Sequence, residues 1–472
     1  MSDRTSSSEQ TTFDHPLPRC SISVRSISST ERHCAALLCE RGARRSRVIR
    51  NRRDASLLTV EHPGVALMCY PYHRGGVTRW MLDAAAEWTR QGVRCWSVAP
   101  VPREPFVSGG NRPTIAELSS DLPLSVRPTI IRPRVGSEFE FGTMAYRASV
   151  YARAVREVVP PGVPIIPADD PSVWLGASWI SSSHPMVGVL HADDAAYYAL
   201  AQQHAPRLAA LACVSSRIAV RARALLEDAA MPIATIPCGI PIPERHSGSP
   251  HDPAPLRLIW VGRMEERQKR VTDLPKIADA LRESGLDFRL TIMGDGPDRT
   301  GVERAVRERS LDDVVRLTGW RDSTMVSALL RESDLFLAPS NFEGFSVAVM
   351  EALAAGCGVV ASRVSGIEDY ENVPLATECL WVHAVGDIAE AVKSIHSAAQ
   401  IPKARRASAA RAFACQEFNI ATCTSRYDAL LTSLASPMGT SLEERSWAAL
   451  AATLLSRPIA ATRRARLWMS AR

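Results

Sequence analysis

Residues 335–361 read LFLAPSNFEGFSVAVMEALAAGCGVVA, and this stretch decides the fold. The apolar run 335–339 predicts a buried strand, and the apolar run 359–361 predicts a second one. Between them lie a short loop and a helical segment that ends at Gly356. Strand, loop, helix and strand in this order are typical of a βαβ unit in a parallel sheet. The stretch therefore predicts an α/β protein.

Two carboxylates stand out within it. Glu343 lies in the loop after the first strand, and Glu351 lies in the helical segment eight residues later. Gly344 lies where we expect the helix to begin, and free N–H groups at such a position bind anions. An anion site between two carboxylates fits a ligand with phosphates and hydroxyls, such as a nucleotide sugar. A helix cap at Glu343 and a solvated helix face at Glu351 explain the pair equally well from this stretch alone.

The composition is that of a globular protein with more than one domain. The chain has 472 residues, 46% hydrophobic and 22% charged, which predicts two or three domains. No run of about twenty apolar residues predicts a transmembrane helix, and the N-terminus lacks the apolar core of a signal peptide. The 11 Cys are scattered without CxxC or Cys/His ligand spacing. We therefore expect no metal site, no disulfide framework and a cytoplasmic protein.

The net charge of +6 is concentrated at the two ends of the chain. Residues 1–60 carry eleven Arg and six acidic residues, and residues 437–472 carry six Arg and two Glu, which leaves a net −3 for residues 61–436. Basic tails fit peripheral contact with an anionic membrane surface or with nucleic acid. We favour the simpler explanation of an Arg-rich genome, because the whole chain contains only four Lys.

The first half of the chain predicts one Rossmann-like domain. A strand at 65–70 is followed by the pair Gly75 and Gly76 and by an amphipathic helix that ends near Gly92. Further strands are expected at 93–98, 163–167, 186–190 and 211–216, the last with a Ser helix start, while residues 100–145 could hold loops and short strands. His191 directly follows a strand, where parallel sheets place ligand chemistry; a packing role explains this His equally well. A helix cap explains the nearby pair Asp193 and Asp194 better than a metal site does.

The second half predicts another such domain after a Pro-rich linker. Strands are expected at 256–261, 288–293 and 314–317, and each is followed by a glycine-containing loop. Arg263 and Lys269 in the first loop could bind a pyrophosphate, although alone they look like a solvated charged run. The expected division is a disordered extension (1–60), an acceptor domain (61–245), a linker (246–255), a nucleotide-sugar domain (256–425), and a crossing helix with a basic tail (426–472).

These motifs together resemble glycosyltransferase family 4. The resemblance covers residues 64–434 and is most specific in the second half, where the order is VGR…K (261–269), MGDGP (293–297), LTGW (317–320), and PS…EGF…EA…G (339–356). It implies the GT-B fold, in which two facing Rossmann-like, doubly wound parallel-sheet domains enclose a cleft. It also implies a retaining, metal-independent transfer of a sugar from a nucleotide diphosphate sugar to an acceptor hydroxyl. No cofactor is expected, because the nucleotide sugar (with UDP or GDP) is a substrate.

The resemblance also implies roles for individual residues. Arg263 and Lys269 would hold the diphosphate, and Glu351 would bind the ribose hydroxyls. Glu343 would meet the donor sugar and phosphate, and His191 would line the reaction centre. The remaining donor-binding residues would be glycines and aromatic residues of the loops: Gly75, Gly76, Gly294, Gly319, Trp320, Gly344 and Phe345. The expected catalytic residues are Glu343, His191, Lys269 and Arg263, and the product would belong to polysaccharide, glycolipid or other glycoconjugate biosynthesis.

The chain departs from the family pattern at four places, one of which is Pro374-Leu375-Ala376-Thr377-Glu378 in place of a glycine-rich turn. Arg270 follows Lys269 where Gly is common, and Gly358 stands where the family usually has Pro. The usual Gly-Gly-x-x-Glu loop is here Ser365-Gly366-Ile367-Glu368. These differences affect the expected donor-sugar contacts and leave the diphosphate site unchanged.

Three other functions compete with a transferase. An inactive nucleotide-sugar-binding subunit is the main alternative, and the presence of every donor-site residue argues against it. A dinucleotide oxidoreductase is disfavoured because the sequence after Gly294 lacks the full G-x-G-x-x-G pattern: position 299 is Arg. A nucleic-acid binder would depend on the basic tails, and we expect no nucleic-acid partner.

Overall fold

The computed structural model describes residues 64–70, 75–102, 129–131, 134–135, 139, 142–244, 255–344 and 346–435. Residues 1–60, nearly all of the expected linker, Phe345 and the basic tail lie outside the described residues. The expectations of an N-terminal extension, of membrane contact through the tails and of a donor contact by Phe345 therefore stay predictions. No helix in the described ranges is long and apolar enough to cross a bilayer.

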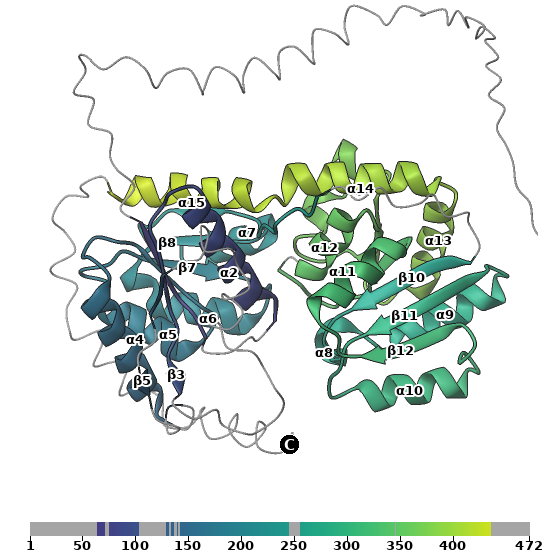
Figure 1. Cartoon of the computed structure of the whole chain (residues 1–472), viewed down its shortest axis with the longest axis horizontal. Helices are drawn as coiled ribbons and strands as arrows, with labels where there is room; N and C mark the ends of the chain where they lie inside the picture. Colours follow the sequence, from purple (N-terminus) through teal and green to yellow (C-terminus); the bar gives the residue numbers. More distant parts are fainter. Residues whose placement is uncertain are drawn as a thin grey trace, which may run out of the picture. The chain divides into compact units, whose positions relative to one another are not determined.

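The first half folds around a seven-stranded parallel sheet in the order β4-β2-β1-β6-β7-β8-β9. Strands β7 and β8 of this sheet are labelled in Figure 1. The strands are β1 (Val65–Met68), β2 (Cys95–Val98), β4 (Thr129–Ile131), β6 (Ile165–Pro167), β7 (Met186–Leu190), β8 (Leu208–Cys213) and β9 (Ile233–Thr235). The helices are α2 (Gly76–Arg90), α4 (Met144–Val158), α5 (Pro171–Trp179), α6 (Ala195–His204) and α7 (Ser216–Leu225). Two short strands, β3 (Val101–Pro102) and β5 (Arg134–Val135), pair separately.

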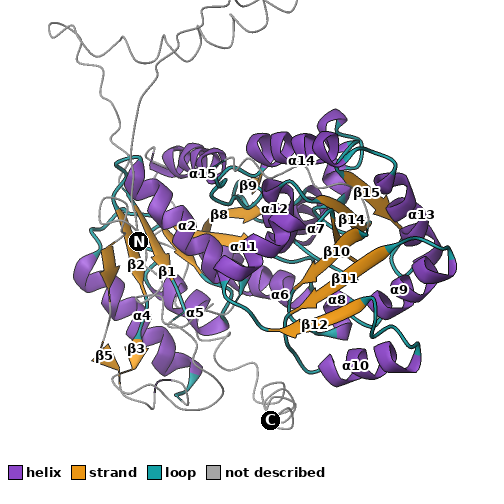
Figure 2. Cartoon of the chain, turned by 45° about the vertical axis from the view of Figure 1, so that its right-hand side comes forward, coloured by secondary structure: helices purple, strands orange, loops and turns teal. Residues whose placement is uncertain are grey.

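The second half folds around a six-stranded parallel sheet in the order β12-β11-β10-β13-β14-β15, shown in orange in Figure 2. The strands are β10 (Leu256–Val261), β11 (Phe288–Met293), β12 (Val315–Gly319), β13 (Leu335–Ala338), β14 (Gly358–Ser362) and β15 (Leu380–His383). The helices are α8 (Glu266–Lys269), α9 (Asp273–Glu283), α10 (Arg299–Glu308), α11 (Ser323–Glu332), α12 (Val347–Ala355), α13 (Ile388–Ala399), α14 (Lys403–Glu417) and α15 (Ile420–Ala435).

The continuous apolar runs at β13 and β14 form strands that are buried on both faces. Leu335 and Leu337 of β13 pack in a cluster with residues of α9 and α13. Phe336, on the other face of the strand, packs in a second cluster with residues of α12 and α14. Side chains alternate between the two faces of a strand, so both faces of a covered parallel strand are apolar. The strands at 256–261 and 288–293 have the bounds that the sequence predicts, although each carries an Arg on one face: Arg257 and Arg289.

The last helix returns to the first half of the chain. Trp88 Nε1 on α2 donates to Asp428 Oδ1 on α15 at 2.7 Å, and Gln91 Nε2 donates to Thr424 Oγ1 at 3.1 Å. The rings of Trp88 and Tyr427 also meet edge to face, with centroids 6.1 Å apart. A helix that follows the second sheet therefore completes the packing of the first.

The two parallel sheets confirm the predicted α/β fold class, and the differences from the prediction are local. The expected strand at 211–216 lies three residues earlier, because Ser215 is the N-cap of α7: its side chain accepts a hydrogen bond from Ile218 N at 3.3 Å. Residues 129–131 form a short edge strand inside the region 100–145, where loops and short strands were expected without stated bounds. The sequence analysis did not predict strand β15, in which only Leu380 and His383 are buried.

Candidate functional site

The centre of the candidate site is an ion pair between Lys269 and Glu343. Lys269 Nζ lies 2.5 Å from Glu343 Oε1, and Ser340 Oγ donates to the same oxygen at 2.8 Å. Gln268 Nε2 lies 3.5 Å from the other carboxylate oxygen. The Glu343 side chain is 9% exposed and that of Lys269 is 19% exposed. The structure thus joins a cation and a carboxylate 74 residues apart, both of which the sequence predicts as site residues.

The loop that carries Glu343 is held to the short helix α8. Asn341 N donates to Gln268 O at 2.7 Å, and Asn341 Nδ2 donates to Arg267 O at 2.9 Å. Arg270, which follows Lys269, has a left-handed backbone with φ 48°. Its side chain donates to the buried Asp273 at 2.6 Å and to Asn341 Oδ1 at 3.1 Å. These contacts offset the cost of a left-handed non-glycine residue, about 1 kcal/mol or more, and explain how Arg replaces the usual Gly.

Gly344 brings His191 of the first sheet next to this loop. A side chain at residue 344 would place its Cβ 1.8 Å from the carbonyl oxygen of His191, so only glycine allows this approach. Gly344 and Ala192 form an antiparallel bridge, and Asp193 N donates to Glu343 O at 3.3 Å. Helix α12 begins only at Val347. Gly344 therefore lies before the helix rather than at its first turn, and the sequence placed the helix start too early.

His191 is buried and held by a carboxylate. Its Nδ1 lies 2.8 Å from Asp169 Oδ1, and its side chain is 5% exposed. The ring of Trp80 packs edge-on against the imidazole, with centroids 5.0 Å apart. His191 Nε2 is buried and has no hydrogen-bond partner among the described residues. Asp169, at the end of β6, is a site residue that the sequence analysis missed, because nothing in the sequence shows that β6 and β7 are neighbours.

Glu351 occupies a different environment on α12. Burial raises its pKa from 4.5 to about 7, the charge of Arg79 lowers it, and the charge of Asp83 raises it. Arg79 Nε in turn donates to Asp83 Oδ2 at 2.9 Å, and burial raises the pKa of Asp83 to about 6. Both partners lie on α2 of the first half. Glu351 thus lies in a low-dielectric environment where a neutral carboxyl competes with the ionised form near neutral pH.

The glycine-rich loops of the second sheet lie side by side at the carboxyl ends of β10, β11 and β12. Gly294 N donates to Gly319 O at 3.0 Å, and a Cβ at residue 294 would lie 1.8 Å from Gly262 O. Close backbone packing is sufficient to explain why residue 294 is a glycine. Trp320 is 68% exposed beside them. An exposed indole at a strand end offers a stacking surface for a base.

Arg263 is the most exposed of the predicted site residues with a charge. Its side chain is 71% exposed, and its guanidinium lies 3.5 Å from Glu265. Surface pairs of this kind contribute little, so the guanidinium can turn to another anion at small cost. Gly75 is the N-cap of α2, and Gly76 lies against Val347, the first residue of α12. The two glycines thus lie near the helix that carries Glu351.

The departures from the family pattern have local explanations. A Cβ at residue 358 would lie 2.9 Å from Cδ of Arg406, so Gly358 makes room for this buried side chain. Arg406 Nη1 donates to Ala398 O at 2.7 Å and thereby caps α13. In the altered loop, Arg217 of α7 donates to both carboxylate oxygens of Glu368, from Nε to Oε1 at 2.5 Å and from Nη2 to Oε2. The loop after β14 therefore contacts α7 instead of remaining open.

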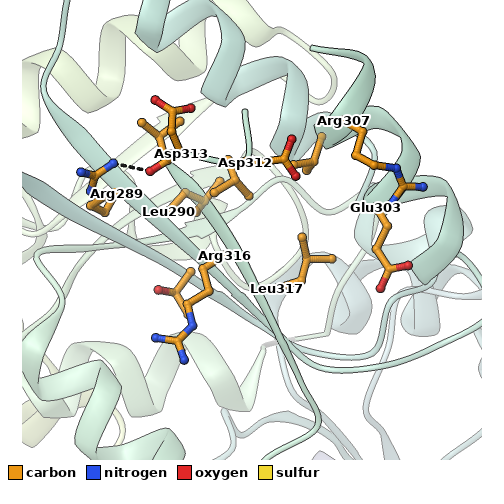
Figure 3. A pocket seen from close by; sticks show the side chains of 12 residues that line it. Arg289, Leu290, Glu303, Arg307, Asp312, Asp313, Arg316 and Leu317 are labelled. Atoms are coloured by element: carbon orange, nitrogen blue, oxygen red, sulfur yellow. Dashed lines mark hydrogen bonds between the residues drawn. The ribbon is translucent and has the colours of Figure 1, made fainter. Parts of the chain in front are cut away.

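A hollow of about 600 Å³ lies away from these residues, beside the edge strand β12 (Figure 3). Three Arg and three acidic side chains line it, so their formal charges cancel: Arg289, Arg307, Arg316, Glu303, Asp312 and Asp313. Arg289 donates to the backbone carbonyl of Asp313. None of the predicted site residues lines this hollow. No group of three or more His, Cys, Asp or Glu in the described part of the chain could hold a metal ion.

The second half of the chain is similar to a known enzyme family. Residues 255–398 match the family model Glycosyl transferases group 1. The match includes Arg263, Lys269, Glu343 and Glu351, whereas His191 lies outside it. The chain is 36% identical over 121 residues to the putative colanic acid biosynthesis glycosyltransferase WcaL of Escherichia coli, which is 24% of this chain and 30% of that protein. It is 32% identical over 178 residues to a glycogen synthase of Mycobacterium tuberculosis, or 36% and 42% of the two chains. The chain thus matches about a third of the length of its curated relatives.

Solved structures resemble a larger part of the chain. S. aureus TarM, in a complex that contains UDP, covers 79% of this chain and all of its own, with a TM-score of 0.62 at 11% identity. Anabaena HepE, in complex with UDP and glucose, covers 78% of this chain and 99% of its own, with a TM-score of 0.60 at 17% identity. At these identities the likeness shows the fold alone, and that fold is GT-B.

Proposed function

We propose that this chain is a glycosyltransferase that moves a sugar from a nucleotide diphosphate sugar to the hydroxyl of a saccharide or other acceptor, with retention at the anomeric carbon. The observation that carries the proposal is the Lys269–Glu343 ion pair of 2.5 Å next to the Gly344–His191 contact. The match of residues 255–398 and the names of the relatives support it. The names also favour a role in polysaccharide biosynthesis.

In the proposed reaction, Lys269 and Arg263 bind the diphosphate without a metal ion. The bond between the anomeric carbon and the diphosphate oxygen breaks, and the acceptor oxygen forms a bond to the same carbon. The acceptor proton moves to a phosphate oxygen of the leaving group, so no protein base is required. Charge that develops on the leaving diphosphate is stabilised by the two cations. Such preorganised electrostatic stabilisation is usually the largest single contribution to catalysis. Glu343 would contact the donor sugar, and Glu351 the ribose.

The test compares two lysines. Wild-type protein is screened by thermal shift with UDP, GDP and ADP and then assayed for transfer with the sugar donors of the nucleotide that stabilises it. We expect Lys269→Ala to lose most of the thermal shift and of the transfer. Lys393→Ala is the matched control, because Lys393 is exposed on α13 and lies outside the site. No shift with any nucleoside diphosphate at millimolar concentration, or equal behaviour of the two variants, would contradict the proposal.

A further inference from the structure

Asp169 forms two hydrogen bonds at the end of β6, one with each oxygen. Tyr197 Oη donates to Oδ2 at 2.6 Å, and His191 Nδ1 lies 2.8 Å from Oδ1. An ionised carboxylate is only an acceptor, so Nδ1 must carry the proton of this second hydrogen bond. The neutral imidazole then has its lone pair on Nε2. The Asp169–Tyr197 pair therefore selects one tautomer of His191.

The other nitrogen of this ring is the unusual group. His191 Nε2 is buried and has no hydrogen-bond partner in the described residues, and Trp80 packs edge-on against the ring. A buried acceptor without a donor is unfavourable unless a ligand supplies one. The backbone of this same residue contacts Gly344, next to the Lys269–Glu343 pair. The unpartnered nitrogen thus belongs to a residue of the candidate site.

His204 provides the internal comparison. Its Nε2 is also buried without a partner among the described residues, and its ring lies 6.0 Å from that of Trp174. Burial lowers the pKa of His204 to about 4, and no carboxylate or tyrosine hydrogen bond to it is present in the described structure. His204 is a packing histidine. His191 differs from His204 because it is hydrogen-bonded to Asp169, which also accepts from Tyr197. A histidine that only packs in a core does not need such a pair.

We propose that Asp169, oriented by Tyr197, is a positioning residue that keeps His191 in the Nδ1–H tautomer, so that Nε2 accepts a hydrogen bond from a hydroxyl of the bound sugar or acceptor. The identity of the ligand rests on the proposed function, whereas the tautomer does not. The neutral ring is an acceptor directed at a hydroxyl and takes no proton in this role. Tyr197 acts only through Asp169.

The tautomer is measured by NMR on the full chain labelled with ¹⁵N histidine, at about pH 8, where an ordinary histidine is neutral. The His191 signals are assigned by their loss in His191→Gln. We expect a protonated Nδ1 and an unprotonated Nε2 in the wild type, and the same in Tyr197→Phe. In Asp169→Asn, the amide can donate to Nδ1, so the Nε2–H tautomer should gain population. A wild-type His191 with Nε2 protonated would overturn the proposal.

Kinetics then separates positioning from a structural role. Asp169→Asn should lower kcat by about ten- to a hundredfold, the range known for carboxylates that orient metal-bound histidines, with a smaller change in the donor KM. His191→Gln keeps a polar group near the place of Nε2 without the link to Asp169. The Asp169→Asn change should therefore have little further effect in a His191→Gln background. An equal fold-loss in both backgrounds would overturn the positioning role.

A control variant and the two independent measurements keep the outcomes distinct. His204→Gln should lower the melting temperature but leave kcat within about twofold of wild type, whereas a loss of kcat equal to that of Asp169→Asn would show a general response to core changes and contradict the proposal. The NMR measurement needs no substrate. The Nδ1–H tautomer in a protein that transfers no sugar would therefore contradict the proposed function alone, and the Nε2–H tautomer in an active transferase would contradict only this inference.

Discussion

Glu343 and Glu351 lie eight residues apart, yet the fold gives them opposite surroundings. Glu343 accepts hydrogen bonds from Lys269 Nζ at 2.5 Å and from the hydroxyl of Ser340 at 2.8 Å. Glu351 lies near the Arg79–Asp83 pair, and burial raises its pKa to about 7. A carboxylate with a cation in contact is preorganised to act on a reacting group, whereas a carboxyl near its pKa can form or lose hydrogen bonds with a ligand's hydroxyls at little cost. The difference supports the proposal that Glu343 has a reaction role and Glu351 a binding role.

The largest effect that this comparison predicts is on sugar transfer in Glu343→Gln. The change keeps the shape of the side chain but removes the charge next to Lys269, so we expect the transfer rate to fall by about a hundred- to a thousandfold. Steady-state rates with the nucleotide sugar chosen by the thermal-shift screen measure it. Glu283→Gln, at an exposed position on α9, is the control and should be unaffected. A Glu343→Gln variant that keeps at least a tenth of the wild-type rate would contradict the reaction role proposed for Glu343.

The next effect concerns the position of Glu343 relative to the first sheet. In Gly344→Ala, the new Cβ cannot lie 1.8 Å from His191 O, so the loop must move away from His191. A displacement of about 1 Å in a catalytic site can cost about a hundredfold in rate. Gly301→Ala on α10 is the matched control, because a Cβ there meets nothing within 4 Å. If both variants kept the wild-type rate, the Gly344–His191 contact would have no role in transfer.

A smaller effect is expected on the pH dependence of stability. The folded-state pKa of Glu351 is raised, so between about pH 4.5 and pH 7 the folded chain binds more protons at this site than the unfolded chain. The free energy of unfolding therefore falls as the pH rises through this window, by at most about 3 kcal/mol for this group. Glu351→Gln should flatten the fall in urea unfolding at pH 5, 6, 7 and 8. A steeper fall in the variant would contradict the environment described for Glu351.

The smallest predicted effect comes from Arg79→Ala. Arg79 lowers the pKa of both Glu351 and Asp83, so its loss should raise both values further. We expect about 1 kcal/mol less stability at pH 8 and almost none at pH 5, where the two carboxyls are mostly neutral. Urea unfolding of the variant at these two pH values measures the difference. An equal loss at both would show that Arg79 acts through packing alone.

Much of the second half was predictable from the sequence because its strands are rich in buried apolar residues. The strands 256–261 and 288–293 have the predicted bounds, and α12 carries Glu351 as expected. The same reasoning gave no bounds for β4 and no strand at β15, because both strands are short and partly exposed. An edge strand lacks the burial that makes a pattern visible in the sequence.

The residue types of the site were predictable, but their partners were not. Lys269 and Glu343 were both expected to contact the donor, whereas their ion pair depends on how the loop 340–344 docks on α8. The Asp169–His191 pair joins the ends of β6 and β7, which the sequence does not place next to each other. The raised pKa of Glu351 likewise depends on residues of α2, more than 260 positions earlier in the chain. Side-chain chemistry is local, whereas electrostatic environment is set by tertiary contacts.

The most direct test of the division between the two carboxylates is calorimetric titration with the nucleoside diphosphate that stabilises the protein, without its sugar. Three proteins are compared: wild type, Glu343→Gln and Glu351→Gln. We predict that Glu343→Gln binds at least as tightly as wild type, because Lys269 is no longer shared with a carboxylate, and that Glu351→Gln binds about tenfold more weakly, because it loses the ribose contact. Weaker binding by Glu343→Gln together with unchanged binding by Glu351→Gln would contradict the account.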